Sequence, residues 1–186
     1  NVYAETVNVI VGSVDVIEAA ADSSDAPVIV PTLGDSNDGS TPEELAALVG
    51  GEEGEVFIGT DGDDVFIGGA GDDVFIGGNG ADTYTGGDGA DTFVIDISAF
   101  AEAGMADMIT DYEGEDTIDL GALLEDALGG PVSEALAQGH VELQSDGANT
   151  DVVVNSGSDD VTVVKLQGIH TAINVLYSDL DIAIIE

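Results

Sequence analysis

The chain has 186 residues, and its 39 Asp and Glu side chains are balanced by a single basic one, Lys165, so its formal net charge is −38 at pH 7. This charge excludes nucleic acids and anionic membrane surfaces as partners, because both require clustered Lys and Arg. Cysteine is absent, which excludes disulfide bonds and thiolate zinc sites and leaves oxygen atoms as ligands for a hard cation.

The first 49 residues are interpreted as an extension with a capping helix. The stretch 22–38 is rich in Asp, Ser, Pro and Gly and indicates a linker. A Thr-Pro-Glu-Glu segment beginning at Thr41 combines an N-cap, a first-turn proline and a glutamate three residues after the cap. We therefore predict a helix over residues 42–49 that covers the open end of a following repeat structure. The alternative is an incidental linker helix.

A nine-residue period runs through the middle of the chain, with the pattern G-G-x-G-x-D-x-U-x, in which U is a large apolar residue. Three blocks fit fully, the second has Thr60 at a Gly position, and the first has Glu53 and Glu55 at a Gly and the Asp position. The blocks are Gly50–Ile58, Gly59–Ile67, Gly68–Ile76, Gly77–Thr85 and Gly86–Val94. Five tandem copies in register indicate a stacked repeat, since one such unit cannot bury its own apolar side.

Each position of the block has a physical role. Glycines allow positive φ and close backbone approach, and the last three residues suit a short strand. Because side chains alternate across a strand, the large apolar residues share one side, which we expect to be the interior: Phe57, Phe66, Phe75, Tyr84 and Phe93. The Asp at position six would lie beside its equivalents in stacked turns. Such a row repels itself unless cations bind; the alternative is that the acidic residues only confer solubility.

This nonapeptide resembles the RTX repeat. The resemblance implies a right-handed parallel β-roll with two blocks per turn and several Ca²⁺ ions between turns on the same side. One site would pair Asp73 with Asp91, a second Asp64 with Asp82, and a third Glu55 with Asp73, where Glu departs from the family's Asp. Carboxylates and turn carbonyls would provide the ligands, at Gly59, Asp61, Asp64, Gly68, Ala70, Asp73, Gly77, Gly78, Asn79, Gly80, Asp82, Gly87, Gly89 and Asp91.

The segments Asp107–Tyr112 and Gly114–Leu120 follow the repeats and resemble the D-x-I-x-D-F…G-x-D-x-I-D-L stretch that follows RTX arrays. This resemblance implies acidic residues that complete the last calcium sites, with Asp111 the first candidate and Asp107 the second. The alternative is a solvated hairpin whose acidic side chains point outward.

Residues 95–186 are predicted to form a β-rich cap with short helices. The resemblance to the terminal domain of large RTX adhesins implies a type I secretion signal in this region. The predicted elements are helices over 120–128 and 132–138, the second ending at Gly139, strands over 141–144, 151–155 and 161–166, and an apolar stretch over 173–176.

Other chemistries lack their motifs. No Lys follows the Gly-rich blocks as in a phosphate-binding loop, and His140 and His170 are isolated rather than in an H-E-x-x-H motif. The carboxylates follow a structural period rather than the paired arrangement of a glycosidase. The third positions of the blocks form no rank of Thr or Asn, which an ice-binding roll would need. We therefore expect no enzyme activity in this chain.

The sequence thus predicts a mainly β chain with three parts: an extension over 1–49, an RTX roll over 50–94 and a secretion-signal domain over 95–186. Because the chain begins at Asn1 without Met, we expect a segment of a longer protein. The resemblance to RTX proteins implies a bacterial protein, secreted or on the cell surface, and we expect the segment to be monomeric and not inserted in a membrane. The expected partners are calcium and, during export, the type I secretion apparatus. An adhesin is the favoured parent; the alternatives are a secreted protease or lipase, or a ligand-binding roll.

Overall fold

The computed structural model describes residues 9–11, 14–18, 28–30, 47–60, 62–95, 106–155, 160–178 and 181–186. The described strands are β1 (Val9–Val11), β2 (Val14–Glu18), β3 (Val28–Val30), β4 (Ala47–Val49), β5 (Glu55–Ile58), β6 (Val65–Ala70), β7 (Val74–Ile76), β8 (Thr83–Asp88), β9 (Thr92–Val94), β10 (Asp107–Ile109), β11 (Thr117–Asp119), β12 (Val141–Ser145), β13 (Asn149–Asn155), β14 (Asp160–Gln167), β15 (Ile173–Ser178) and β16 (Asp181–Ile185). The described helices are α2 (Gly121–Leu128) and α3 (Glu134–His140).

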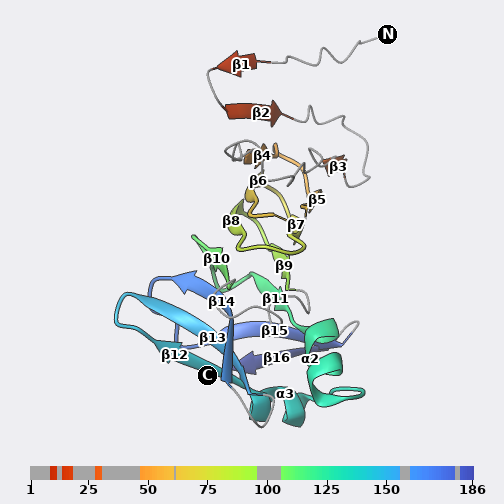
Figure 1. Ribbon diagram of the computed structural model, residues 1–186, viewed down its shortest axis with the longest axis vertical. Helices are drawn as coiled ribbons and strands as arrows, with labels where there is room; N and C mark the ends of the chain where they lie inside the picture. The colour runs from red at the N-terminus through yellow and green to blue at the C-terminus, as the bar shows by residue number, and fades with distance from the viewer. Residues whose placement is uncertain are drawn as a thin grey trace.

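The strands form two sheets, with the orders β1-β2-β4-β6-β8-β10-β14-β13-β12 and β16-β15-β11-β9-β7-β5-β3. Their rungs follow one another along the long axis of the molecule, and the helices lie at the C-terminal end (Figure 1). Successive blocks alternate between the sheets, so that β5, β7 and β9 pair in parallel in one sheet and β4, β6 and β8 in the other. This topology confirms the predicted parallel β-roll with two blocks per turn.

The interior of the roll is an aromatic stack. The five predicted core residues, Phe57, Phe66, Phe75, Tyr84 and Phe93, are all 0% exposed. Within one sheet, the ring centroids of Phe57 and Phe75 are 4.9 Å apart and those of Phe75 and Phe93 are 5.2 Å apart. In the other sheet, Phe66 and Tyr84 stack at 5.3 Å. These spacings are close to the distance of about 4.8 Å between neighbouring strands, so each added rung extends the stack.

The predicted capping helix over residues 42–49 is wrong in its last three residues, and residues 42–46 lie outside the described residues. Ala47–Val49 forms β4, whose Leu48 is in register with Phe66 and is 4% exposed. A helix of about two turns has little stability of its own, because helix nucleation is unfavourable. As strand β4, the same residues join the parallel ladder to β6 and bury Leu48 over the aromatic stack. These interactions stabilise the strand more than the N-cap and first-turn residues stabilise a helix.

The two segments after the repeats continue the roll instead of forming a hairpin. Strand β10 pairs in parallel with β8, and β11 pairs in parallel with β9. Ile109 is thereby in register with Tyr84, and Ile118 with Phe93, and both isoleucines are fully buried. The solvated-hairpin alternative is therefore excluded.

The C-terminal part extends the same two sheets. Strand β14 joins β10 in parallel and β15 joins β11 in parallel, after which β13, β12 and β16 are added antiparallel. The predicted helices and strands of this region are confirmed, although α3 begins at Glu134 instead of residue 132 and continues through Gly139 to His140. Leu123 and Leu124 anchor α2 in the core, where both are fully buried. Among the described helices, none is long and apolar enough to cross a membrane.

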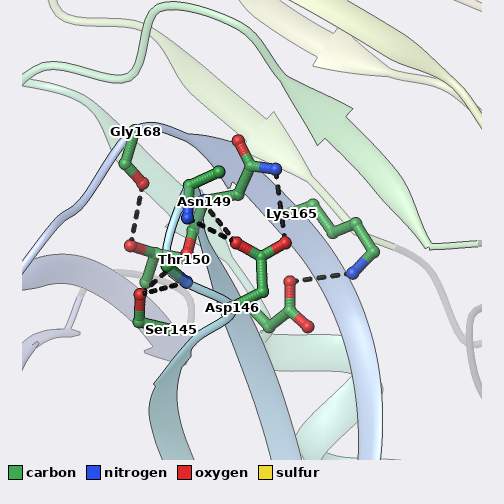
Figure 2. A network of polar contacts seen from close by, with 9 residues as sticks. Ser145, Asp146, Asn149, Thr150, Lys165 and Gly168 are labelled. Carbon is green, nitrogen blue, oxygen red and sulfur yellow. Dashed lines mark hydrogen bonds and ion pairs between the residues drawn. The ribbon is translucent and has the colours of Figure 1, made fainter.

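The chain contains almost no positive charge that could neutralise its carboxylates. Lys165, its single basic residue, pairs across β13 and β14 with Asp151, with 2.8 Å between Nζ and Oδ1 (Figure 2). In the same view, Asp146 accepts hydrogen bonds of 2.7 Å from the backbone N–H groups of Ala148 and Asn149, which lower its pKa. Both interactions lie near the β12–β13 turn and leave the acidic turns of the roll without a basic partner.

Candidate metal centre

In the third, fourth and fifth blocks, the sixth residue directs its carboxylate at the turn two blocks earlier. The Oδ1 atom of Asp73 accepts a hydrogen bond from the Glu55 N–H at 2.7 Å, and Asp91 Oδ1 accepts from the Asp73 N–H at 2.9 Å. On the other side of the roll, Asp82 Oδ1 accepts from the Asp64 N–H at 2.8 Å. We name these two sets, with their continuations, the first row (Glu55, Asp73, Asp91, Asp116) and the second row (Asp64, Asp82, Asp107).

Both rows continue beyond the repeats. Asp107 Oδ1 accepts from the Asp82 N–H at 2.9 Å, and Asp116 Oδ1 accepts from the Asp91 N–H at 3.1 Å. Asp111 has a different place, because its two oxygens accept from the N–H groups of Gly86 and Gly87 at 2.9 and 3.0 Å. Of the two candidates predicted after the repeats, the structure therefore places Asp107 in a row and Asp111 on the backbone of the last turn.

Asp116 was not among the predicted site residues, although the sequence contains a signal for it. The segments Asp107-Met108-Ile109 and Asp116-Thr117-Ile118 repeat the D-x-U pattern that ends each block. Each of these aspartates lies 25 residues after its row neighbour instead of 18. Because of this longer spacing, a search that continues the repeats at a fixed period of nine does not reach Asp107 or Asp116.

The middle of each row is buried, and this burial opposes ionisation. Asp73 is 0% exposed, and Asp82 and Asp91 are each 1% exposed. Burial is the main cause that raises the pKa of Asp73 to about 7, that of Asp82 to about 7 and that of Asp91 to about 6, and neighbouring carboxylates raise them further. Burial also raises the pKa of the Tyr84 hydroxyl well above its ordinary value. Near neutral pH, keeping these buried carboxylates ionised therefore costs free energy unless a cation compensates their charge.

Two oxygens in the first row are left without partners. Asp73 Oδ2 and Asp91 Oδ2 are buried and have no hydrogen-bond partner among the described residues. The ends of the row differ: the Glu55 carboxylate accepts from the Gly51 N–H at 3.1 Å, and Asp116 Oδ2 accepts from the Glu113 N–H at 2.7 Å. Buried polar atoms are rarely left unpaired. The two atoms therefore mark the middle of the first row, between Asp73 and Asp91, as the place for a cation.

The first glycine of a block brings a carboxylate and a carbonyl oxygen together. A Cβ atom added to Gly68 would overlap Asp73 Oδ2 and would lie 2.5 Å from the carbonyl oxygen of Gly86. At Gly59, an added Cβ would overlap the Gly77 carbonyl oxygen and would lie 2.7 Å from Asp64 Oδ2. Carboxylate and carbonyl oxygens are the ligands that Ca²⁺ prefers, so the donor set fits this ion.

Carbonyl oxygens are needed to complete such a site. Within the described ranges, no group of three or more His, Asp or Glu side chains is placed to hold a metal ion. Calcium takes six to eight oxygen ligands, so one or two carboxylates require several carbonyls beside them. The Gly86 carbonyl was not among the predicted ligands, although Gly86 occupies the same block position as Gly59, Gly68 and Gly77.

The remaining predicted ligands lie in the turns. Ala70 donates its N–H to the Gly51 carbonyl at 2.8 Å, and Asn79 donates to the Thr60 carbonyl at 3.2 Å, so each turn is tied to the turn two blocks earlier. Asp61 lies outside the described residues. The predicted glycines with positive φ, between 97° and 140°, are Gly78, Gly80, Gly87 and Gly89.

Residues 50–93 match the RTX calcium-binding nonapeptide repeat, in four copies. The roll is an RTX calcium-binding repeat region. Repeats of this kind bind several calcium ions per region and are typical of secreted bacterial proteins. The RTX repeat is a binding and structural motif.

Among solved structures, the chain is similar to the AlgE6R3 subunit of the mannuronan C5-epimerase from Azotobacter vinelandii, determined in solution. The sequence identity is 28% and the TM-score is 0.47, and the match covers 73% of this chain and 79% of that one. Comparison with curated proteins gives no match.

We call the place where the first glycine of a block meets a carboxylate and a carbonyl oxygen the cradle. The substitution Gly68→Ala tests this cradle. Its Cβ would displace Asp73 Oδ2 and crowd the Gly86 carbonyl, and overpacking of this kind costs about 1–3 kcal/mol. We expect calcium affinity, measured by isothermal titration calorimetry, to fall about tenfold or more. The control is Gly114→Ala, because a Cβ at Gly114 meets nothing within 4 Å. Equal affinities for the two variants would contradict the assignment of this cradle.

Proposed function

We propose that this chain is a calcium-binding segment of a larger extracellular protein, and that its roll folds when calcium binds after export. The observation that carries the proposal is the pair of buried, unpartnered oxygens on Asp73 and Asp91. Two ionised carboxylates in this setting oppose folding, whereas a divalent cation between them turns the repulsion into attraction. The buried middle of the row then stabilises the fold only when the ion is bound.

The coupling between binding and folding follows from linkage. The rows exist only in the folded chain, because their members are separated by 18 or 25 residues in sequence. A ligand that binds the folded state alone stabilises it in proportion to the logarithm of its concentration. Where free Ca²⁺ is scarce, as in the cytoplasm, the acidic repeats stay unfolded and can be exported. In calcium-rich surroundings the roll folds, which disfavours return through the export channel.

The proposed ligands are carboxylates from both rows together with turn carbonyls. In the first row, Asp73 and Asp91 hold an ion with carbonyls such as those of Gly68 and Ala70. In the second row, Asp64 and Asp82 hold another, and Asp107 extends the row. Glu55 and Asp116, at the ends of the first row, already accept backbone hydrogen bonds through their outer oxygens, so we assign them structural roles.

We assign to residues 95–186 a role in export, namely recognition by a type I secretion apparatus. What supports this assignment is their position directly after an RTX region, together with the acidic and apolar C-terminal stretch. The chain would leave the cell with its C-terminus first, and its β-rich end would then provide a surface on which the roll folds, since β14 and β15 pair with β10 and β11. A large adhesin is the proposed parent protein.

Replacing Asp73 by Asn tests the calcium site with two opposite expectations. The change removes a buried charge and should make the metal-free roll no less stable, but it should weaken calcium binding at least tenfold, or about 1.4 kcal/mol. Calorimetric titration measures the calcium affinity, and the concentration of trimethylamine N-oxide at half-maximal folding in EDTA measures the stability of the metal-free roll. Asp126→Asn removes the same charge from the exposed side of α2 and should change neither. Unaltered calcium affinity in Asp73→Asn would refute the site.

An export assay tests the secretion signal. In cells that carry a type I apparatus, we expect the full chain to reach the medium and a chain without its last sixty or so residues to stay in the cells. A chain without residues 1–46 is the matched control and should still be exported, because the signal is assigned to the other end. Export of the C-terminally shortened chain at the level of the full chain would contradict the assignment.

A further inference from the structure

The two rows differ in what their inner oxygens contact. In the first row, Asp73 Oδ2 and Asp91 Oδ2 have no partner among the described residues. In the second row, the Tyr84 hydroxyl lies between two carboxylates, 3.4 Å from Asp82 Oδ2 and 3.4 Å from Asp107 Oδ2. The position that holds Phe in the other four blocks thus holds, in this block alone, an aromatic residue that can donate a hydrogen bond to the carboxylates of a row.

The ring of Tyr84 behaves as a core residue, so the hydroxyl is what distinguishes it. The ring is fully buried and stacks on Phe66 with an angle of 12° between their planes, as Phe57 stacks on Phe75 with an angle of 10°. Shape and burial alone would be served equally well by Phe. The hydroxyl adds one donor to a buried region that otherwise contains acidic acceptors.

The hydroxyl lies in the same cradle that the first glycines form. A Cβ added to Gly77 would overlap both Asp82 Oδ2 and the Tyr84 hydroxyl oxygen. At the equivalent Gly68, an added Cβ would overlap Asp73 Oδ2 and would lie 2.9 Å from Cζ of Phe75. The two rings therefore approach the two cradles in the same way, and only Tyr84 brings a donor with it.

We propose that the Tyr84 hydroxyl does part of the work of a cation in the second row, so that the two rows depend unequally on calcium. Its single proton can be donated to Asp82 or to Asp107 but not to both at once, so it relieves one carboxylate and leaves the other to an ion. The first row has no such donor and depends on calcium fully. The comparison with a cation rests on the proposed function, whereas the hydrogen bonds themselves do not.

The test compares full-length variants in EDTA, where no bound calcium can replace the hydrogen bond of Tyr84. Trimethylamine N-oxide favours compact states, so the osmolyte concentration at half-maximal folding, followed by far-UV circular dichroism, measures the stability of the metal-free roll. We expect Tyr84→Phe to need more osmolyte than the parent chain, with the apparent folding constant lowered about two- to tenfold, as for one buried hydrogen bond. In saturating calcium the roll is folded without osmolyte, so urea unfolding measures its stability there. We expect a smaller difference between the two chains, because the ion takes the place of the lost donor.

Reciprocal and matched variants sharpen the result. Phe75→Tyr adds a hydroxyl beside the unpartnered oxygens of the first row and should need less osmolyte than the parent. Phe66→Tyr is the matched comparison and should gain less than Phe75→Tyr, because Asp64 Oδ2 already accepts from the N–H and hydroxyl of Thr60 and Asp82 Oδ2 already lies 3.4 Å from the Tyr84 hydroxyl.

Two outcomes would overturn the inference: Tyr84→Phe equal to the parent in EDTA, or a deficit of the same size with and without calcium, which would mean a purely structural role. Failure of the parent chain to respond to calcium would instead overturn the proposed function. The comparison of variants in EDTA would still be decisive for Tyr84, because it involves no bound ion.

Discussion

Carboxylates stacked in rows and withdrawn from water are the constraint on which this structure depends. Each rung buries an aromatic or aliphatic side chain, which favours stacking, and at the same time brings an Asp carboxylate against the preceding turn on the same side. One oxygen of the carboxylate is used to tie the two turns through a backbone N–H, as between Asp91 and Asp73. In Asp73 and Asp91 the other oxygen is left inside the turn without a partner among the described residues, and its charge must be met by something the chain does not supply.

The ends of the rows show how the same chemistry is managed without an ion. The Glu55 carboxylate folds back onto the Gly51 N–H, Asp64 accepts from Thr60, and Asp116 accepts from Glu113. Among the described residues, buried side-chain oxygens without a hydrogen-bond partner occur only in the middle of the first row. The repeats are therefore closed by local partners at both ends and require external charge between them. This arrangement explains how residues that fit the repeat poorly, such as Glu55, complete the array instead of weakening it.

Much of the roll could be predicted because its determinants recur at a fixed spacing. The interior placement of Phe57 to Phe93 follows from the period and from alternation along a strand, whereas the two-block turn was implied by the resemblance to the RTX repeat. Residues 47–49 were wrongly predicted to end a helix because the helix signals are local, whereas the partner of Leu48 is Phe66, two blocks away. Asp116 was missed because it lies outside the period of nine. The role of Tyr84 was missed because its ring packs like the other core aromatic rings, and only the position of its hydroxyl distinguishes it.

The coupling of calcium to folding is tested most directly by comparing the intact chain in EDTA and in millimolar Ca²⁺ by far-UV circular dichroism, with the radius of gyration from small-angle X-ray scattering on the same samples. The account predicts a weak strand signal and an expanded chain in EDTA, and a strong strand signal with a compact, elongated particle in calcium. Identical spectra and equal radii under the two conditions would contradict it.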